Sequence, residues 1–204
     1  MVAIIDYGVG NLFSLKSSFE FLGQSAAVTN DRKVIENSDR IILPGVGAFG
    51  DAAKKLEGSG MAQVVMSEAE KGKPILGICL GMQLLFEKSL EYGCHRGLGL
   101  VGGTVRPLSD IIDKSLDIPH IGWNSLSFTK PCEIFKYINE GDFVYFVHSF
   151  YGADCKDSLC AVTEYSVPVT AAVCRDNIFG TQFHPEKSGQ TGLKILKAFC
   201  EVKA

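Results

Sequence analysis

Residues 74–83 read Pro-Ile-Leu-Gly-Ile-Cys-Leu-Gly-Met-Gln. The stretch opens with an apolar run at 74–78, and a helical pattern of apolar residues follows at 82–87. A short, continuous apolar run is typical of a strand that is buried on both faces of a parallel sheet. The stretch therefore predicts a central strand, a sharp turn and a helix, which together form a unit of the α/β fold class.

Upstream of this stretch, strand patterns and helix patterns alternate. The expected strands lie at 2–6, 26–29 and 40–43, and the expected helices lie at 11–22 and 61–71. Asn11 can cap the first helix, because its side-chain oxygen can accept a hydrogen bond from a free backbone N–H group. The alternation predicts a mostly parallel central sheet flanked by helices.

Downstream of the same stretch, the chain is richer in strands. The expected strands lie at 101–106, 121–128, 143–148, 161–165, 169–174 and 178–183. Arg-Asp-Asn at 175–177 indicates a hairpin turn, and an amphipathic helix at 189–202 closes the chain. Because no linker, repeat or low-complexity segment interrupts the pattern, we expect a single domain over residues 1–204.

The composition argues against several classes of partner. The formal net charge is −3, so no excess of basic residues favours nucleic acid or anionic lipid. No apolar run approaches the roughly 20 residues of a membrane helix, and the start of the chain lacks the pattern of a signal peptide. The seven cysteines are scattered, without a CxxC pair or zinc spacing. We expect a cytoplasmic protein with no metal, no other cofactor, no nucleic-acid partner and no membrane partner.

Cys79 is the first candidate for chemistry. It lies at the expected strand-to-helix turn, with Gly77 and Gly81 two residues away on either side. This arrangement is the cysteine form of the G-x-S-x-G nucleophile elbow, whose tight turn leaves no room for side chains at the flanking positions. At the start of a helix, free N–H groups and the helix dipole favour a thiolate. The N–H group of Leu80 can then face a developing oxyanion.

A buried structural cysteine is the alternative interpretation, because free cysteine is among the most buried residue types. The other six cysteines fit that role, since none of them has glycines at both flanking positions. For Cys79, the two glycines and the strand–turn–helix context favour the nucleophile.

His184 is the candidate base. A thiol nucleophile needs a nearby base, which is usually a histidine oriented by a third group. Pro185 favours extended backbone at His184, so His184 and Glu186 can lie on the same side of the chain, and the carboxylate can then fix the imidazole tautomer. Two alternatives stay open: a surface histidine beside a charged residue, and His148 as the base.

A glycine-rich loop at 45–50, Gly-Val-Gly-Ala-Phe-Gly, follows the expected strand at 40–43. It matches the G-x-G-x-x-G dinucleotide fingerprint, which would require a second strand ending in Asp or Glu about 20 residues later. That region falls inside the expected helix at 61–71, so the context argues against NAD or FAD. We expect instead a loop whose N–H groups face Cys79.

Two motifs carry a family resemblance. Gly-Ile-Cys-Leu-Gly-Met-Gln at 77–83 and His-Pro-Glu at 184–186 resemble the motifs of class I glutamine amidotransferases of the Cys-His-Glu type. Further blocks, in the family's order over nearly the whole chain, are similar to the glutaminase subunits of imidazole glycerol phosphate synthases. These blocks are DYGVGNL at 6–12, PGVG at 44–47, HIGWN at 120–124, YFVHS at 145–149 and FHPEKS at 183–188. The resemblance implies the flavodoxin-like class I amidotransferase fold with a strand-rich C-terminal half.

The resemblance also implies a reaction. Cys79 would attack the side-chain amide of glutamine and form a glutamyl thioester, while His184 would protonate the departing ammonia and then activate water. The implied oxyanion-hole residues are Val46 and Leu80. The residues implied to hold glutamine are Gly47, Gln83, Ser149 and Phe150, although a tyrosine often stands at the position of Phe150 in the family.

A partner chain is implied as well. A domain of this size shows no site for a second substrate, and free ammonia would be lost to solvent. In the family, ammonia passes to a (β/α)8-barrel cyclase subunit, and this heterodimer makes imidazole glycerol phosphate and AICAR in histidine biosynthesis. The residues implied at the partner interface and gate are Asn11, Trp123, Tyr145 and Lys187. Glycines on both sides of Val46 would let docking select a productive oxyanion loop.

Three other functions stay open. The segment Ser-Asp-Ile-Ile-Asp-Lys at 109–114 matches no family block, which leaves room for a paralogous subunit that serves a different synthase. A stand-alone cysteine hydrolase would use the same nucleophile and base. A non-catalytic binding module is the third possibility, and the intact Cys79, His184 and Glu186 argue against it.

Overall fold

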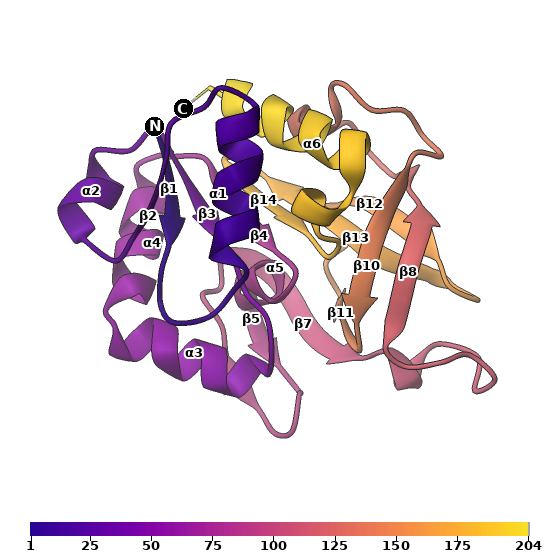
Figure 1. Ribbon diagram of the computed structural model, residues 1–204. Helices are drawn as coiled ribbons and strands as arrows, with labels where there is room; N and C mark the ends of the chain where they lie inside the picture. Colours follow the sequence, from indigo (N-terminus) through magenta and orange to yellow (C-terminus); the bar gives the residue numbers. More distant parts are fainter. Residues whose placement is uncertain (204) are drawn as a thin grey trace.

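The computed structural model describes residues 1–203, and an eight-stranded sheet forms its centre (Figure 1). The strand order is β2-β1-β3-β4-β14-β13-β12-β9. From β2 to β14 the neighbours pair in parallel, and the last three strands continue the sheet antiparallel. The strands are β1 (Val2–Ile5), β2 (Ala26–Thr29), β3 (Arg40–Leu43), β4 (Ile75–Ile78), β9 (Ser127–Phe128), β12 (Leu159–Glu164), β13 (Pro168–Arg175) and β14 (Ile178–Thr181).

Helices cover both faces of this sheet. They are α1 (Leu12–Phe21), α2 (Arg32–Glu36), α3 (Phe49–Gly58), α4 (Met61–Glu70), α5 (Leu80–Leu84) and α6 (Gly189–Glu201). Successive side chains of a strand point to opposite faces. In β1, Val2 and Ile4 accordingly pack in the core cluster that contains α1 and α6, whereas Ala3 and Ile5 pack in the cluster that contains α3 and α4. The prediction of a mostly parallel sheet flanked by helices is confirmed.

Two smaller sheets extend the strand-rich half. One joins β8 (His120–Ser125) and β10 (Phe143–His148) in an antiparallel pair. The other has the order β11-β7-β5-β6, with bounds Phe150–Ala153, Val101–Pro107, Phe86–Ser89 and His95–Arg96. Short 3₁₀ turns lie at η1 (Leu108–Asp110), η2 (Glu133–Phe135) and η3 (Pro185–Lys187).

The local signals of the sequence predict several element ends. The Asn11 side chain accepts a hydrogen bond from the N–H group of Ser14 at 3.4 Å, so the expected cap of α1 is confirmed. β13 and β14 form the expected hairpin, with Asp176 at a φ of 51° in the turn. The predicted closing helix is α6.

Two expectations about elements are wrong, and one helix was not predicted. The helix expected at 82–87 ends at Leu84, because the carbonyl groups that would continue it accept hydrogen bonds from residues 98–101 instead, and the chain from Phe86 pairs with β7. The strand expected at 121–128 divides into β8 and β9, which lie in different sheets on either side of the buried Leu126. The glycine-rich loop at 45–50 leads into α3, a helix that the sequence analysis did not predict.

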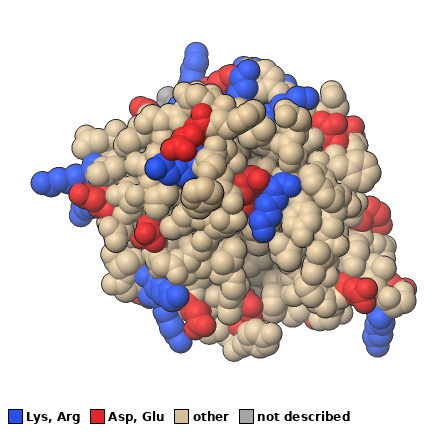
Figure 2. Space-filling view, in the orientation of Figure 1, with Lys and Arg blue, Asp and Glu red and all other residues tan. Residues whose placement is uncertain are grey.

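The surface carries charges of both signs. Figure 2 shows Lys and Arg interspersed with Asp and Glu over one face of the molecule, without a continuous basic stripe on that face. Among residues 1–203, no helix is both long enough and apolar enough to span a membrane.

Candidate active site

The carboxyl edge of the main sheet brings the candidate residues together. β3, β4 and β14 are neighbours in the sheet; the glycine loop follows β3, Cys79 follows β4, and His184 follows β14. The N–H group of Cys79 donates to the carbonyl of Thr181 at 2.7 Å, which joins the ends of β4 and β14. Because the carboxyl ends of parallel strands meet at one edge, three segments distant in sequence share one site.

Cys79 lies on a strained turn between β4 and α5. Its φ is 54° and its ψ is −111°, a backbone conformation that costs a non-glycine residue on the order of 1–3 kcal/mol and that clusters at functional sites. A Cβ atom on Gly81 would lie 1.8 Å from the carbonyl oxygen of Leu43, and one on Gly77 would lie 2.6 Å from that of Gly81. The expectation that both flanking positions require glycine is confirmed.

The Cys79 thiol is buried, with 8% of the residue exposed. The side-chain amide of Gln182 donates to its Sγ at 3.7 Å, and Sγ lies 3.9 Å from the carbonyl oxygen of Val147. The sequence analysis did not identify Gln182, whose role depends on a contact between segments distant in the chain.

Tyr7 is another residue that the sequence analysis did not identify as functional. Its hydroxyl donates to the carbonyl of Pro44 at 2.7 Å, at the start of the glycine loop. Burial, and secondarily the charge of Cys79, raise the pKa of Tyr7. The phenol is therefore a stable, neutral donor that fixes the beginning of the loop beside the thiol.

His184 and Glu186 form a buried pair. Nδ1 of His184 lies 2.8 Å from Oε1 of Glu186, and the two side chains are 3% and 1% exposed. The other carboxylate oxygen, Oε2, is buried without a hydrogen-bond partner in residues 1–203, so the contact with His184 compensates the burial of this charge. Burial alone would lower the pKa of His184, but hydrogen bonds to Cys79 and Glu186 raise it to about 9. The raised pKa favours a protonated His184 imidazole beside the thiol.

The backbone of His184 is held against β10. Its N–H group donates to the carbonyl of Tyr145 at 3.0 Å, and its own carbonyl accepts from the hydroxyl of Ser188 at 2.7 Å. The same hydroxyl accepts from the N–H group of Tyr145 at 2.9 Å. Ser188 is a third residue that the sequence analysis did not identify, although it ends the FHPEKS block.

His148, the alternative base, is placed differently. Its Nδ1 lies 2.8 Å from the carbonyl oxygen of Phe150, and its Nε2 lies 3.1 Å from Nδ1 of His120. Burial is the main cause that lowers its pKa to about 4. Both ring nitrogens are engaged and the ring resists protonation, so the geometry disfavours His148 as the base for Cys79.

The glycine loop lies against the elbow. A Cβ atom on Gly45 would lie 2.7 Å from the backbone nitrogen of Gly81, so the loop backbone touches the turn after Cys79. Gly47 has a φ of 92°, and Val46 is 45% exposed between these two glycines. The loop is therefore close enough to the elbow for the oxyanion role expected of Val46.

Glu91 anchors the far end of this loop. Its carboxylate accepts the N–H group of Phe49 at 2.7 Å, where α3 begins, and the residue is buried. Burial raises the pKa of Glu91, partly offset by this hydrogen bond and by His95. No local pattern in the sequence identified Glu91 as functional, because its partner Phe49 lies more than forty residues away in the chain.

Gln83 connects the elbow helix to the corner between β10 and β11. Its side-chain nitrogen donates to the carbonyl of Phe150 at 3.2 Å and to Oε1 of Gln182 at 3.0 Å. Ser149 precedes Phe150 at the same corner, and its carbonyl accepts from Leu108 at 2.9 Å. The structure thus brings Gln83 and the segment Ser149–Phe150 together, as expected for residues that share one ligand.

Known proteins resemble this chain in sequence and in fold. A family model described as glutamine amidotransferase class-I matches residues 3–202. The chain belongs to the class I glutamine amidotransferases. It is 52% identical over 203 residues to imidazole glycerol phosphate synthase subunit HisH of Caldanaerobacter subterraneus subsp. tengcongensis, covering 99% of this chain and 98% of the relative. Subunit HisH of Aquifex aeolicus is 48% identical over 198 residues, covering 96% and 94%.

Solved structures agree on the fold of this amidotransferase. A crystal structure of a glutamine amidotransferase superposes with a TM-score of 0.76 at 17% identity, covering 98% of each chain. The glutaminase domain of Trypanosoma brucei CTPS with bound acivicin superposes with a TM-score of 0.67 at 20% identity, covering 100% of this chain and 94% of that one. The fold expected from the resemblance is confirmed, and the family assigns the chain to the enzymes that hydrolyse glutamine.

Three of the four expected gate residues of the amidotransferase lie together. The rings of Trp123 and Tyr145 are 6.1 Å apart at 70°, and Nζ of Lys187 lies 5.9 Å from the centre of the Tyr145 ring. Trp123 is 54% exposed. Asn11, the fourth, caps α1 through its side chain. Tyr145 and Lys187 of this cluster also form backbone hydrogen bonds with His184, each at 3.0 Å.

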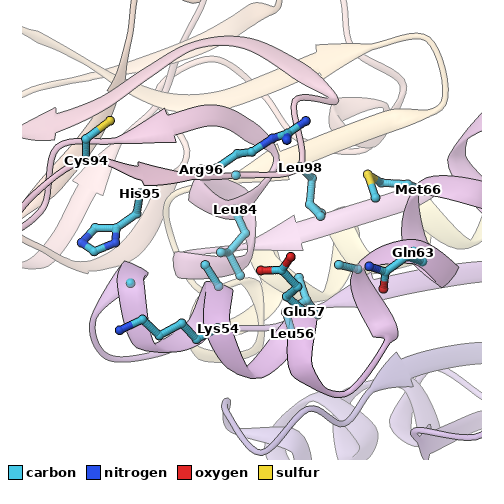
Figure 3. A pocket seen from close by; sticks show the side chains of 14 residues that line it. Lys54, Leu56, Glu57, Gln63, Met66, Leu84, Cys94, His95, Arg96 and Leu98 are labelled. Atoms are coloured by element: carbon cyan, nitrogen blue, oxygen red, sulfur yellow. The ribbon is translucent and has the colours of Figure 1, made fainter.

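A separate cavity of about 420 Å³ lies between α3, α4 and the chain around β6 (Figure 3). Lys54 and Glu57 line it from α3, and the run from Cys94 to Leu98 forms the facing wall. The triad candidates are not among its lining residues. Within residues 1–203, no group of three His, Cys, Asp or Glu side chains could hold a metal ion.

Proposed function

We propose that this chain is the glutaminase subunit of an imidazole glycerol phosphate synthase and acts in the cytoplasm as one domain over residues 1–204. The observation that carries the proposal is the pairing of the strained Cys79 elbow with the buried His184–Glu186 pair at one edge of the sheet. Relatives of nearly full length that are named as HisH subunits support this synthase over other ammonia acceptors.

Cys79 is the proposed nucleophile. Its sulfur attacks the amide carbon of glutamine, a C–S bond forms, and the carbonyl electrons move onto the oxygen. His184, protonated at Nε2, gives its proton to the amide nitrogen as the C–N bond breaks, so ammonia leaves and a glutamyl thioester remains. His184 then takes a proton from water, whose oxygen attacks the thioester carbon; the C–S bond breaks, and Cys79 leaves as the thiolate beside the protonated His184. Glutamine and water thereby become glutamate and ammonia, with Glu186 orienting the imidazole in both steps.

The oxyanion of each step needs donors that are already in place. We assign this role to the backbone N–H groups of Val46 and Leu80, one on the glycine loop and one on the first residue of α5. Removal of a single oxyanion-hole donor costs on the order of 10²–10³ in kcat in other enzymes. A change in the orientation of the Val46 peptide would therefore change kcat enough to control the whole reaction.

Glutamine brings two further charges to the site. We propose that Gly47, Gln83 and the segment Ser149–Phe150 hold its backbone end. Its ammonium group requires an anion, and Glu91 is a buried carboxylate at the end of the glycine loop. Oε2 of Glu91 accepts the N–H group of Phe49, and we propose that the carboxylate also binds the ammonium group of glutamine. Burial of a charged carboxylate costs free energy, which a neighbouring cation offsets. Glutamine would therefore bind more tightly than amides that lack the ammonium group.

The proposed partner is a (β/α)8-barrel cyclase subunit in a heterodimer. Ammonia released at Cys79 would react there with a phosphorylated ribulosyl intermediate to give imidazole glycerol phosphate and AICAR. The proposed interface and gate comprise Asn11, Trp123, Tyr145 and Lys187. The exposed Trp123 and the cation–aromatic contact of Lys187 with Tyr145 support this face, because both border the segment that carries His184.

The test is the rate of glutamine hydrolysis by the isolated chain, by the chain with the cyclase subunit, and by the pair with the cyclase's nucleotide ligand. We expect slow hydrolysis alone and an increase of roughly a thousandfold with partner and ligand, which corresponds to about 4 kcal/mol of coupling. A full rate in the isolated chain that the cyclase does not change would support a stand-alone hydrolase. Stimulation by a different synthase would support a paralogous subunit.

A further inference from the structure

A pair of buried histidines, His120 and His148, lies beside the triad candidates. His148 ends β10, and His120 begins β8 directly opposite it in the antiparallel pair. The two residues are 5% and 4% exposed. The ring of His120 lies between those of Phe146, at 4.9 Å, and Tyr165, at 4.1 Å. This packing leaves the His120 ring little freedom to turn.

The hydrogen bonds determine the tautomer of both rings. Phe150 offers a carbonyl oxygen, which can only accept, so Nδ1 of His148 carries the proton in the 2.8 Å contact. In a neutral ring Nε2 is then an acceptor, so Nδ1 of His120 must donate across the 3.1 Å contact. A single directed chain of donors therefore runs from His120 through His148 to Phe150.

The carbonyl of Phe150 accepts hydrogen bonds from two side chains. Its carbonyl accepts from His148 at 2.8 Å and from Gln83 at 3.2 Å. Two donors use both lone pairs of a carbonyl oxygen and fix the plane of that peptide group. This peptide group joins Phe150 to Tyr151, at the end of the segment proposed to hold the backbone end of glutamine.

We propose that His120 and His148 are positioning residues, a neutral hydrogen-bonded pair that fixes the Phe150 carbonyl and thereby sets the glutamine-binding corner between β10 and β11. This inference rests on the proposed function. The chain of hydrogen bonds starts at His120 on β8, and the opposite face of this strand exposes Ile121 and Trp123. The corner is therefore attached to the strand that carries part of the proposed partner face.

The surroundings of the pair favour its neutral state. The ionisable groups that face His148 are His120 and His184, and a second positive charge beside a protonated His184 would be repelled. Tyr165 stacks on His120, and its hydroxyl is engaged with the carbonyl of Asp117 at 2.8 Å. Protonation of His148 at Nε2 would also remove the acceptor for His120 and break the chain.

Two variants of His148, studied in complex with the cyclase, test the proposal. In His148→Leu the donor to Phe150 is lost, and we expect the KM for glutamine to rise about tenfold to a hundredfold while kcat stays within about threefold. In His148→Asn the side-chain amide occupies the place of Nδ1, and we expect a KM within about threefold of the wild type. A fall of kcat at constant KM in His148→Leu would overturn the positioning role.

Alkylation of Cys79 separates positioning from general damage. A glutamine-analogue alkylator depends on the glutamine-binding corner, whereas iodoacetamide needs only an accessible thiol. We expect His148→Leu to slow labelling by the analogue about tenfold or more and to leave iodoacetamide labelling unchanged. Equal slowing of both reagents would indicate a structural role and overturn the proposal.

The wild-type complex provides a test without any variant. Nitrogen-15 NMR of the histidine rings should show both His120 and His148 neutral at pH 7, with each proton on Nδ1. A charged His148, or a neutral His148 with its proton on Nε2, would overturn the proposal. This result does not depend on whether the variants fold. If the wild-type complex did not hydrolyse glutamine, the proposed function would fail, and the NMR result would still decide the geometry of the pair.

Discussion

His184 follows β14 and His148 ends β10, and both are buried, yet they are held in opposite states. Nδ1 of His184 meets the carboxylate of Glu186, whereas Nδ1 of His148 meets a backbone carbonyl. Burial lowers the pKa of each ring, but the partners of His184 raise its pKa to about 9, while that of His148 falls to about 4. The partners of the two rings therefore differ: Cys79 first, and Glu186 at Nδ1 second, raise the pKa of His184, whereas the ionisable groups that face His148 are other histidines.

The comparison depends first on the thiol that the two histidines flank. We expect Cys79→Ala to abolish glutamine hydrolysis, because no other cysteine lies at the elbow. A glutamine-analogue alkylator should label Cys79, as mass spectrometry of the digested protein would show. Cys94 is exposed and serves as the internal control for non-specific reaction. Stoichiometric labelling of Cys94 or Cys174 in place of Cys79 would refute the assignment.

Exchanging each histidine for asparagine tests the comparison directly. His184→Asn removes the proton carrier, and we expect kcat to fall by about 10²–10⁴, the usual contribution of a general acid–base group. His148→Asn is the matched control, since the same substitution at the neutral site keeps a donor toward Phe150. We expect its kcat to stay within about threefold. The reverse pattern, with His148→Asn inactive and His184→Asn active, would show that the base was misassigned.

Glu186→Gln tests whether the carboxylate is what distinguishes the two sites. The substitution preserves shape and removes the charge, so the pKa of His184 should fall toward the behaviour of His148. We expect a loss of about 10–100-fold in kcat, smaller than for His184→Asn, because an orienting group contributes less than the proton carrier. Proton NMR of the His184 ring would follow the pKa. An unchanged pKa would mean that Cys79 alone sustains it.

The sequence predicts the local part of this site. Gly77, Cys79 and Gly81 mark the elbow within five residues, although the clash that requires glycine at position 81 is with the neighbouring strand at Leu43. His184 and Glu186 come together within three residues. The structure confirms the elbow and the proximity of His184 to Glu186, but Glu186 reaches the ring from the 3₁₀ turn η3 and not from the extended chain that the sequence analysis expected. The alternation of apolar segments was likewise sufficient for the parallel sheet, since burial on both faces follows from strand composition.

The non-local part could not be predicted. Glu91 reaches Phe49, and Gln182 reaches Cys79, through contacts that depend on the whole fold. The run at 121–128 has one continuous strand pattern, but its two ends pair with different strands. Phe86 fits a helical pattern and still joins β5, because pairing with β7 outweighs local propensity.

The pH dependence of stability should show both histidines with opposite signs. The pKa of His184 is raised, so its contribution is complete below the unfolded value of about 6.5 and is lost as pH rises through about 9. The pKa of His148 is lowered, so its contribution is complete above about 6.5 and is lost as pH falls through about 4. Each shift corresponds to a contribution on the order of 3 kcal/mol.

Urea unfolding at pH 4.5, 6.5 and 8.5 would measure these two contributions. We expect His148→Asn to flatten the loss of unfolding free energy on the acid side and His184→Asn to flatten the loss on the alkaline side. Each variant is the control for the other, because both replace a buried imidazole by an amide that does not titrate. Identical pH profiles for the two variants would contradict the assignment of opposite states.

The smallest expected effect concerns the link between the His184 site and the partner. Nζ of Lys187 lies 5.9 Å from the centre of the Tyr145 ring, and the backbone of Tyr145 holds His184. An exposed cation–aromatic contact stabilises by about 0.5–1 kcal/mol. We therefore expect Lys187→Ala or Tyr145→Ala to change the ligand-stimulated rate of the complex about two- to fivefold, with an unchanged melting temperature for Lys187→Ala. Lys114→Ala, in an exposed segment outside the site, should leave the rate unaltered. If Lys187→Ala altered the hydrolysis rate of the isolated chain by the same factor as that of the complex, Lys187 would belong to the His184 site itself and not to its coupling with the cyclase.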